Sequence, residues 1–268
     1  MATREIDTAR ARTELIEAGS GVPLVLLHPF PFTADVWEGE IEAFSTRRHV
    51  IAPSLRGFGR TAPFDESVPP SIDAMADDVA ALLDALEVTS PAVVGGLSMG
   101  GYVALAFARR HPERLHALLL ADTRAEPDDA EAREKRDASI ARVEREGTGA
   151  FVDGMLANVV GETTRASRPE VMKRLRDLMA SVPAPTIAKA LVALRDRPDA
   201  RPDLATIRVP TLVVVGTEDT VTPPSVAEAM ASVIPRATLA LLPGAGHLTN
   251  VETPAAFHEA VERFLAPL

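Results

Sequence analysis

Six apolar runs without polar alternation recur along this chain, and they restrict its fold more than any other feature. They are VPLVLLHP (22–29), RRHVIAPS (47–54), SPAVVGG (90–96), LHALLLAD (115–122), PTLVVVG (210–216) and ATLALLP (237–243). Runs of this kind are typical of strands that are buried on both faces. Because helical patterns separate most of them, the sequence predicts an α/β fold with a mainly parallel central sheet flanked by helices.

The alternation stops between about residues 124 and 207, where three or four helical stretches follow one another without a strand candidate. We expect an inserted helical cap, or lid, over residues 124–207, on a core formed by residues 1–123 and 208–268. The first stretch, EPDDAEAREKRDASIARVEREG (126–147), is charged around most of its surface and is predicted to lie on the outside. A later apolar stripe at helical spacing is predicted to pack inside the cap rather than contact substrate. The stripe consists of Val171, Met172, Leu175, Leu178, Met179 and Val182.

The composition narrows the classes of function. With 268 residues, 46% of them hydrophobic, the chain can bury a sizeable core. A net charge of −10 opposes contact with a phosphate backbone, so we expect no nucleic-acid partner. The amino terminus lacks an apolar signal region, and no run approaches the roughly 18 apolar residues of a membrane span. We therefore expect a cytoplasmic protein without membrane attachment, whose oligomeric state the sequence leaves open.

Residue types also restrict the available chemistry. The chain has no cysteine, which excludes disulfides, thiolate nucleophiles and cysteine-bound zinc. No two histidines have a metal-ligand spacing such as H-E-x-x-H, so we expect neither a metal nor another cofactor. Four histidines are expected to have structural or surface roles: His49, His111, His116 and His258. We also expect Trp37 and Phe58 to pack rather than line a pocket mouth.

One serine lies in a strand-to-helix context. The stretch GGLSMGG holds the pattern G-x-S-x-G from Gly96 to Gly100, after an apolar run and before a helical one. A serine at such a sharp turn needs small residues two positions before and after it, and the free N–H groups of the helix would stabilise an oxyanion. The pattern predicts that Ser98 is a nucleophile. The alternative is a glycine-rich turn with an incidental serine.

A nucleophilic serine needs a base and an acid that orients the base. Asp219 follows the run PTLVVVG, and His247 lies in the glycine-rich stretch GAGHLTN after ATLALLP. Both therefore fall at the carboxyl ends of predicted strands, where open α/β sheets build their sites. Either residue alone would fit an ordinary loop. The three placements together, in the order Ser, Asp, His, predict a catalytic set.

The oxyanion would need two N–H donors. We expect them to be the backbone amides of Phe30, which follows the first long run, and of Met99, which follows the serine. Pro29 has no N–H, but the donor required is one residue later. His28 is expected to support this loop rather than act as a base.

With these residues in place, the chain resembles the α/β-hydrolase superfamily over nearly its full length, and more closely its serine carboxylesterases and enol-lactonase-like members. The resemblance rests on LVLLHPFPFTADVW, VIAPSLRGFGRT, GGLSMGGYVALAFA, VVVGTEDTVTPP and GAGHLTN. Two positions depart from the family pattern. Pro29 stands where the family has glycine, and Ser54 stands where it usually has an acid.

The resemblance and the residues together predict a carboxylesterase. The substrate would be a small to medium, mainly apolar ester, cleaved through an acyl-enzyme on Ser98. A lactonase would use the same residues, and an acyltransferase would replace water with an alcohol or amine. A ligand-binding protein that retains the hydrolase scaffold is the alternative from another class.

Overall fold

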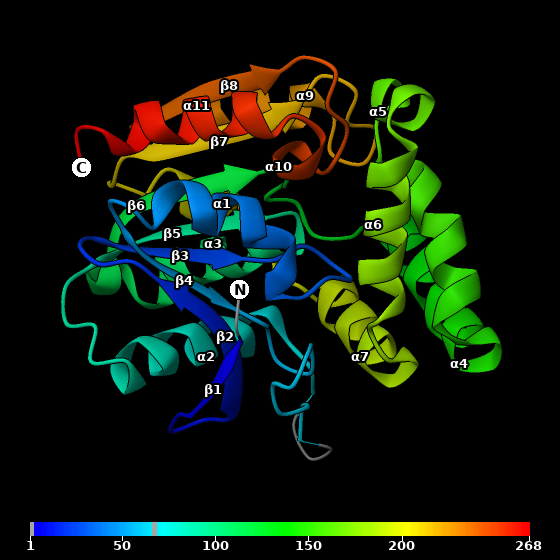
Figure 1. Ribbon diagram of the computed structural model, residues 1–268. Helices are drawn as coiled ribbons and strands as arrows, with labels where there is room; N and C mark the ends of the chain where they lie inside the picture. Colours follow the sequence, from blue (N-terminus) through cyan, green and yellow to red (C-terminus); the bar gives the residue numbers. More distant parts are fainter. Residues whose placement is uncertain (1–2, 66–68) are drawn as a thin grey trace.

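The computed structural model describes residues 3–65 and 69–268, and its centre is one sheet of eight strands (Figure 1). The strand order is β1-β2-β4-β3-β5-β6-β7-β8, with β1–β2 and β2–β4 antiparallel and every other neighbouring pair parallel. The strands are β1 (Arg4–Asp7), β2 (Arg12–Ala18), β3 (Pro23–Leu27), β4 (His49–Pro53), β5 (Ala92–Leu97), β6 (Leu115–Ala121), β7 (Thr211–Gly216) and β8 (Ala237–Leu242). The predicted mainly parallel α/β fold is confirmed.

Helices cover both faces of the sheet. They are α1 (Glu38–Phe44), α2 (Ile72–Ala85), α3 (Met99–Arg110), α9 (Pro224–Val233), α10 (Thr249–Glu252) and α11 (Pro254–Leu265), with short 3-10 turns η1 (Ala34–Trp37) and η2 (Pro112–Arg114). Side chains alternate along a strand, and in β3 Val25 packs in one apolar cluster while Leu26 packs in the other. The first cluster contains the buried residues of α2 and α3, and the second contains those of α1 and α11. The core is therefore two apolar layers with the sheet between them.

Between β6 and β7 the chain forms a run of helices that we call the helical segment. It comprises α4 (Ala130–Val159), α5 (Glu162–Ser167), α6 (Pro169–Ala180), α7 (Ala184–Arg195) and α8 (Arg201–Leu204). In Figure 1, α4 to α7 stand beside the edge where the parallel strands end. Helix α4 breaks at Gly147, which has φ +77°, and most of its first half is exposed. In α6, Val171, Leu175 and Met179 are buried, as the apolar stripe predicts.

Two features of the sheet differ from the sequence analysis. Strands β1 and β2 were not among the predicted runs; they form an antiparallel hairpin on the edge of the sheet. The expectation that every apolar run is covered on both faces is wrong for β8, where Leu239 is 37% and Leu241 43% exposed. The reason is position: β8 is the other edge strand, and one side of its chain lacks the cover that central strands receive.

In the described part of the chain, no single helix has the length and apolarity to cross a membrane. Helices α6 and α7 reach that length and hydropathy only as a pair, and the pair is bent by 92°.

Candidate active site

Ser98 lies on the sharp turn between β5 and α3. Its backbone has φ 53° and ψ −113°, a strained conformation for a residue other than glycine. A Cβ on Gly96 would lie 2.0 Å from the carbonyl oxygen of Gly100, and a Cβ on Gly100 would lie 2.0 Å from that of Leu27. Larger residues at either glycine would therefore break the turn. The Ser98 amide is fixed by donating to Ala121 at 2.9 Å, and Thr123 Oγ1 donates to the Ser98 carbonyl at 2.9 Å.

The structure brings Ser98, His247 and Asp219 together from three separate strand ends. Nε2 of His247 lies 2.8 Å from Oγ of Ser98, and Nδ1 of His247 lies 2.8 Å from Oδ2 of Asp219. Both His247 and Asp219 are buried, while Ser98 is partly exposed. The carboxylate of Asp219 is held by further donors: the amides of Val221 at 2.8 Å and Thr222 at 2.9 Å, and the hydroxyl of Thr222 at 2.6 Å.

The pKa values of His247 and Asp219 are shifted by burial in one direction and by their mutual charges and hydrogen bonds in the other. Burial lowers the pKa of His247, but the hydrogen bond and charge of Asp219, with the nearby charge of Asp122, outweigh it, so the pKa lies above its usual value. The charge of Arg124 opposes this rise. Burial raises the pKa of Asp219, and the hydrogen bond and charge of His247, with the Thr222 bonds, bring it below its usual value. The pair therefore favours an ionised aspartate beside an imidazole that accepts protons readily.

The amides proposed to hold an oxyanion belong to buried residues. Met99 is the first residue of α3, so its N–H points out of the helical hydrogen-bond ladder. In the loops and turns of the described chain, no backbone hydrogen bond uses the N–H of Phe30. The ring of Phe30 packs edge-on against Phe151 of α4 at 5.9 Å.

His28 contacts the backbone of the loop that carries Phe30. It is fully buried, its Nε2 accepts from the Leu55 amide at 2.9 Å, and its Nδ1 lies 2.9 Å from the Pro29 carbonyl oxygen. One ring nitrogen accepts and the other donates, so the ring is neutral. Burial lowers the pKa of His28 to about 4. The Pro29 carbonyl also accepts from the Phe32 amide at 3.0 Å, which fixes the loop despite the departure from glycine.

Ser54, which stands where the family usually has an acid, is hydrogen-bonded to a carboxylate of the adjacent strand β2. The hydroxyl of Ser54 donates to Glu14 of β2 at 2.9 Å, and the Arg60 amide donates to the same carboxylate at 3.2 Å. Ser54 Oγ also accepts from the Ala34 amide at 3.2 Å. A buried carboxylate is thus present at this place, although another residue carries it.

The helical segment is bonded directly to the loops of His247 and Asp219. The His247 amide donates to the carbonyl of Val159, the last residue of α4, at 3.0 Å. The buried carboxylate of Glu252 accepts from the amides of Gly161 at 2.8 Å and Leu248 at 3.0 Å. The Thr163 amide donates to Glu218, the neighbour of Asp219, at 2.9 Å. We call this set of contacts the junction clamp.

Three functional candidates near the site were not predicted: Asp122, Thr222 and Glu252. Asp122 is fully buried at the end of β6, and the sequence carried a signal for it, because it ends the run LHALLLAD in the way that Asp219 follows PTLVVVG. Thr222 is three residues after Asp219 in a turn that side-chain donors commonly close. No motif marks Glu252, one of whose two amide partners, Gly161, belongs to a distant segment.

The other singled-out residues have structural surroundings. Trp37 and Phe58 are fully buried, and Phe58 packs against the ring of His28 at 4.9 Å. His49, His111 and His258 each contact a carboxylate, and His116 is exposed. Within residues 3–65 and 69–268, no group of three or more histidine, aspartate or glutamate side chains has an arrangement that could hold a metal.

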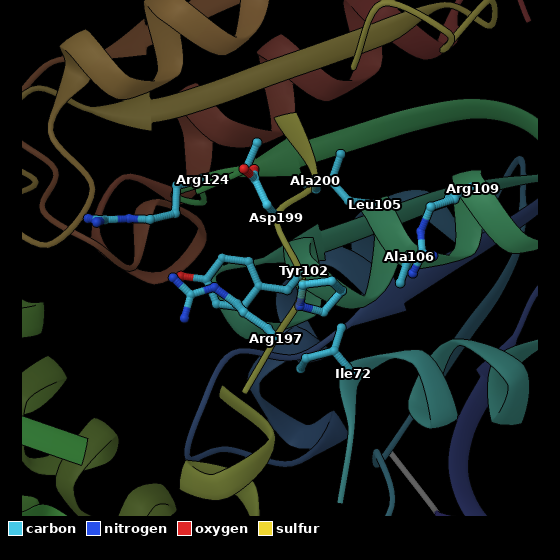
Figure 2. A pocket seen from close by; sticks show the side chains of 11 residues that line it. Ile72, Tyr102, Leu105, Ala106, Arg109, Arg124, Arg197, Asp199 and Ala200 are labelled. Carbon is cyan, nitrogen blue, oxygen red and sulfur yellow. The ribbon is translucent and has the colours of Figure 1, made fainter. Parts of the chain in front are cut away.

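A separate recess lies beside α3 (Figure 2). Its lining includes Tyr102, Arg124 and Arg197. The guanidinium of Arg197 stacks over the Tyr102 ring at 4.5 Å and is paired with Asp128 at 2.6 Å. Neither Ser98 nor His247 lines this recess.

Comparison with known proteins agrees with this geometry. The family described as alpha/beta hydrolase fold matches residues 22–254, so the chain belongs to the α/β-hydrolase family and is a hydrolase. It is similar to 3-oxoadipate enol-lactonase 2 from Acinetobacter baylyi, with 32% identity over 85% of this chain and 82% of the relative.

Two solved structures are similar over nearly their whole length. A thermophilic esterase from Thermogutta terrifontis has a TM-score of 0.93 and 38% identity, covering 100% of this chain and 99% of that one. The enol-lactonase from Burkholderia xenovorans has a TM-score of 0.89 and 26% identity, covering 98% of this chain and 100% of that one.

Proposed function

We propose that the protein is a carboxylesterase that cleaves small to medium, mainly apolar esters through an acyl-enzyme on Ser98. The observation that carries the proposal is the continuous hydrogen-bonded line from Ser98 through His247 to Asp219, with 2.8 Å at each step. These are the distances that proton transfer between a nucleophile and its base requires. The similarity to an esterase from Thermogutta terrifontis supports the same reaction class.

In the proposed reaction, Nε2 of His247 takes the proton of Ser98 while Oγ attacks the ester carbonyl carbon. The carbonyl oxygen becomes an oxyanion between the amides of Phe30 and Met99. The C–O bond to the alcohol then breaks, and His247 gives its proton to the leaving alcohol. Water attacks the acyl group on Ser98 with His247 again as base, which releases the acid and restores the hydroxyl. Asp219 stays ionised and stabilises the imidazolium.

The preference for apolar esters rests on what surrounds the proposed oxyanion amides. Phe30 and Met99 belong to one apolar cluster, against which Phe151 and Met155 of α4 pack. We propose that residues 124–207 act as a lid, whose α4 covers the substrate with these side chains. The partner is then a small-molecule ester, and no nucleic acid or membrane is involved in catalysis. Location in the cytoplasm stays a prediction from the sequence.

A lactonase is the second candidate, favoured by the two enol-lactonases among the similar proteins. A cyclic ester would open by the same steps, but the freed hydroxyl would stay attached to the acyl group, and water would release one hydroxy acid from Ser98. A panel of p-nitrophenyl acetate, butyrate and octanoate beside simple lactones separates the two activities by their kcat/KM values.

The deciding experiment joins turnover to the identity of the nucleophile. Treatment with a fluorophosphonate should abolish ester turnover and place its label on Ser98, as located by mass spectrometry. Ser98→Ala should lower kcat by about 10³-fold or more, since little catalysis survives loss of the nucleophile. Ser232→Ala, on the surface of α9, is the matched control and should keep the wild-type rate. An unlabelled Ser98 in a protein without turnover would support the ligand-binding alternative.

The pH profile gives a second test. Only neutral His247 accepts the proton of Ser98, so kcat/KM should rise with pH through the pKa of His247. Since Asp219 and Asp122 raise this pKa against the effect of burial, the midpoint should lie above the ordinary value of 6.5. A midpoint well below 6.5 would contradict the assignment of His247 as the base.

A further inference from the structure

Asp122 is a second buried carboxylate beside the proposed catalytic set, and the mechanism above gives it no role. It follows β6 directly, is fully buried and has φ 45°, in the left-handed region that few residues other than glycine adopt. Its amide still pairs with β7, donating to Val214 at 2.9 Å. Burying an ionisable side chain costs folding free energy unless the group is hydrogen-bonded or paired with another charge.

All the donors that the described structure gives this carboxylate come from the strand and loop that carry Asp219 and His247. Oδ1 accepts from the amide of Gly216, the last residue of β7 and three residues before Asp219, at 3.1 Å. Oδ2 accepts from the amide of Thr249 at 3.2 Å and from its hydroxyl at 2.5 Å. Thr249 is two residues after His247. The Asp122 carboxylate therefore joins the two polypeptide segments whose spacing sets the distance between His247 and Asp219.

The charge of Asp122 also acts on His247, and the charges of Asp219 and His247 act on Asp122 in turn. Burial and the charge of Asp219 raise the pKa of Asp122 to about 7, against the charge of His247 and the bonds from Thr249. The charged groups that act on His247 are Asp219 from the β7 loop, Asp122 from the end of β6 and Arg124 just beyond it. When Asp122 is ionised, two carboxylates thus stabilise the protonated imidazole, and one guanidinium opposes them.

We propose that Asp122 is a positioning residue of the hydrolase: it ties the Asp219 and His247 loops together, and in its ionised form its negative charge stabilises the protonated form of His247. It contacts neither the substrate nor Ser98 and acts through the pair of His247 and Asp219. The inference rests on the proposed role of His247 as the base. Its physical content, the effect of one buried charge on one imidazole, is measurable without turnover.

The test compares Asp122→Asn with Asp84→Asn. Asparagine keeps an acceptor for Gly216 or Thr249 and tolerates positive φ, so Asp122→Asn removes the charge with the least disturbance of the backbone. The side chain of Asp84 is 69% exposed. Asp84→Asn therefore changes the net charge by the same amount, but at the surface and away from the site. The readout is the pKa of the His247 ring by NMR titration, with the resonance assigned from a His247→Gln variant.

The pKa of His247 should fall by about half a unit or more in Asp122→Asn and stay unchanged in Asp84→Asn. The acid limb of kcat/KM should move to lower pH by the same amount, with kcat reduced several-fold. Thr249→Val removes one donor to the carboxylate and should move the His247 pKa in the same direction by less. An unchanged His247 pKa in a folded Asp122→Asn protein would overturn the proposal.

The role of Asp122 and the proposed function are tested independently by these experiments. The NMR titration needs no substrate, so a protein without esterase activity would count against the proposed function while the pKa comparison still decides the role of Asp122. If Asp122→Asn does not fold, the Thr249→Val titration decides, and an unchanged His247 pKa there would overturn the proposal. A fall in thermal stability without a change in pKa would show a merely structural residue.

Discussion

The carboxylate of Glu14 accepts a hydrogen bond from the hydroxyl of Ser54 at 2.9 Å, although Glu14 belongs to β2 and Ser54 follows β4. The two residues are neighbours across the sheet, because Leu15 pairs with Pro53 in the antiparallel register and the Ser54 amide donates to the Glu14 carbonyl at 2.9 Å. Where the family usually has an acid on the loop, this chain has the acid on the adjoining strand. The carboxylate at this place therefore comes from Glu14.

A second carboxylate at this place should therefore be harmful. We expect Ser54→Asp to lower the free energy of unfolding by about 1 to 3 kcal/mol, because two buried carboxylates would repel and the Ala34 amide would lose its present acceptor. Glu14→Gln in the Ser54→Asp background should recover part of the loss. Guanidinium unfolding of the two single variants and the double variant measures this cycle. A Ser54→Asp protein as stable as the wild type would refute the prediction that a second carboxylate beside Glu14 is harmful.

His28 predicts a loss of stability in mild acid. Burial holds its pKa at about 4 in the folded protein, against 6.5 for a free histidine, so the unfolded chain binds more protons between these values. The free energy of unfolding should fall as the pH drops from 6.5 towards 4, by about 3 kcal/mol in all from this residue. His28→Gln, which keeps an acceptor for the Leu55 amide, should flatten this slope. The exposed His116→Gln should not, and urea unfolding at several pH values compares the two.

The junction clamp should affect the reaction as well as the fold. Glu252→Ala leaves the buried amides of Gly161 and Leu248 without acceptors, so we expect a loss of about 1 to 3 kcal/mol in stability. Because Leu248 adjoins His247, kcat should fall more than KM rises. Glu259→Ala is the control: Glu259 also lies near the carboxyl terminus but is 72% exposed, paired with Arg263. Equal kcat values in the two variants would show that the junction clamp does not position His247.

Two glycines of α4 form a matched pair. Gly147 has φ +77°, in the left-handed region, and the φ of Gly149 lies outside that region. A Cβ added at either position would meet no atom within 4 Å. Gly147→Ala should therefore be destabilising by about 1 kcal/mol through backbone strain alone, and Gly149→Ala should be stabilising by about 0.5 to 1 kcal/mol through helix propensity. Thermal melts of the two variants measure both signs. A stabilised Gly147→Ala protein would mean that the break in α4 straightens at low cost.

The sequence was most informative where one local pattern contained the whole constraint. Ser98 was predicted because its turn needs Gly96 and Gly100 beside it, and Asp219 and His247 because parallel strands bring their carboxyl ends to one edge. Asp122 ends a strand in the same way, but no motif distinguishes it from an ordinary loop aspartate. Gly161, one partner of Glu252, lies 91 residues away in the sequence, and no local pattern reveals such a contact.

The strands that escaped prediction did so for a related reason. REID and RTELIEA, the sequences of β1 and β2, mix charged and apolar residues because they form an edge hairpin rather than the buried centre. The run ATLALLP reads as central because its residues are apolar, and only the strand order shows that β8 lies on the rim. Composition reports the hydrophobicity of a strand, whereas its neighbours are set by topology.

The bond between Val159 and the His247 amide has a consequence for protein engineering. A helical segment that covers a site invites replacement by the corresponding segment of a relative in order to change substrate preference. Here the carbonyl oxygen of Val159, the last residue of α4, accepts from the amide of the proposed base at 3.0 Å, so a graft that replaces the carboxyl end of α4 would alter the chemistry together with the specificity. An exchange confined to residues before Gly147, or one that carries residues 159–163 unchanged, would leave that backbone bond in place.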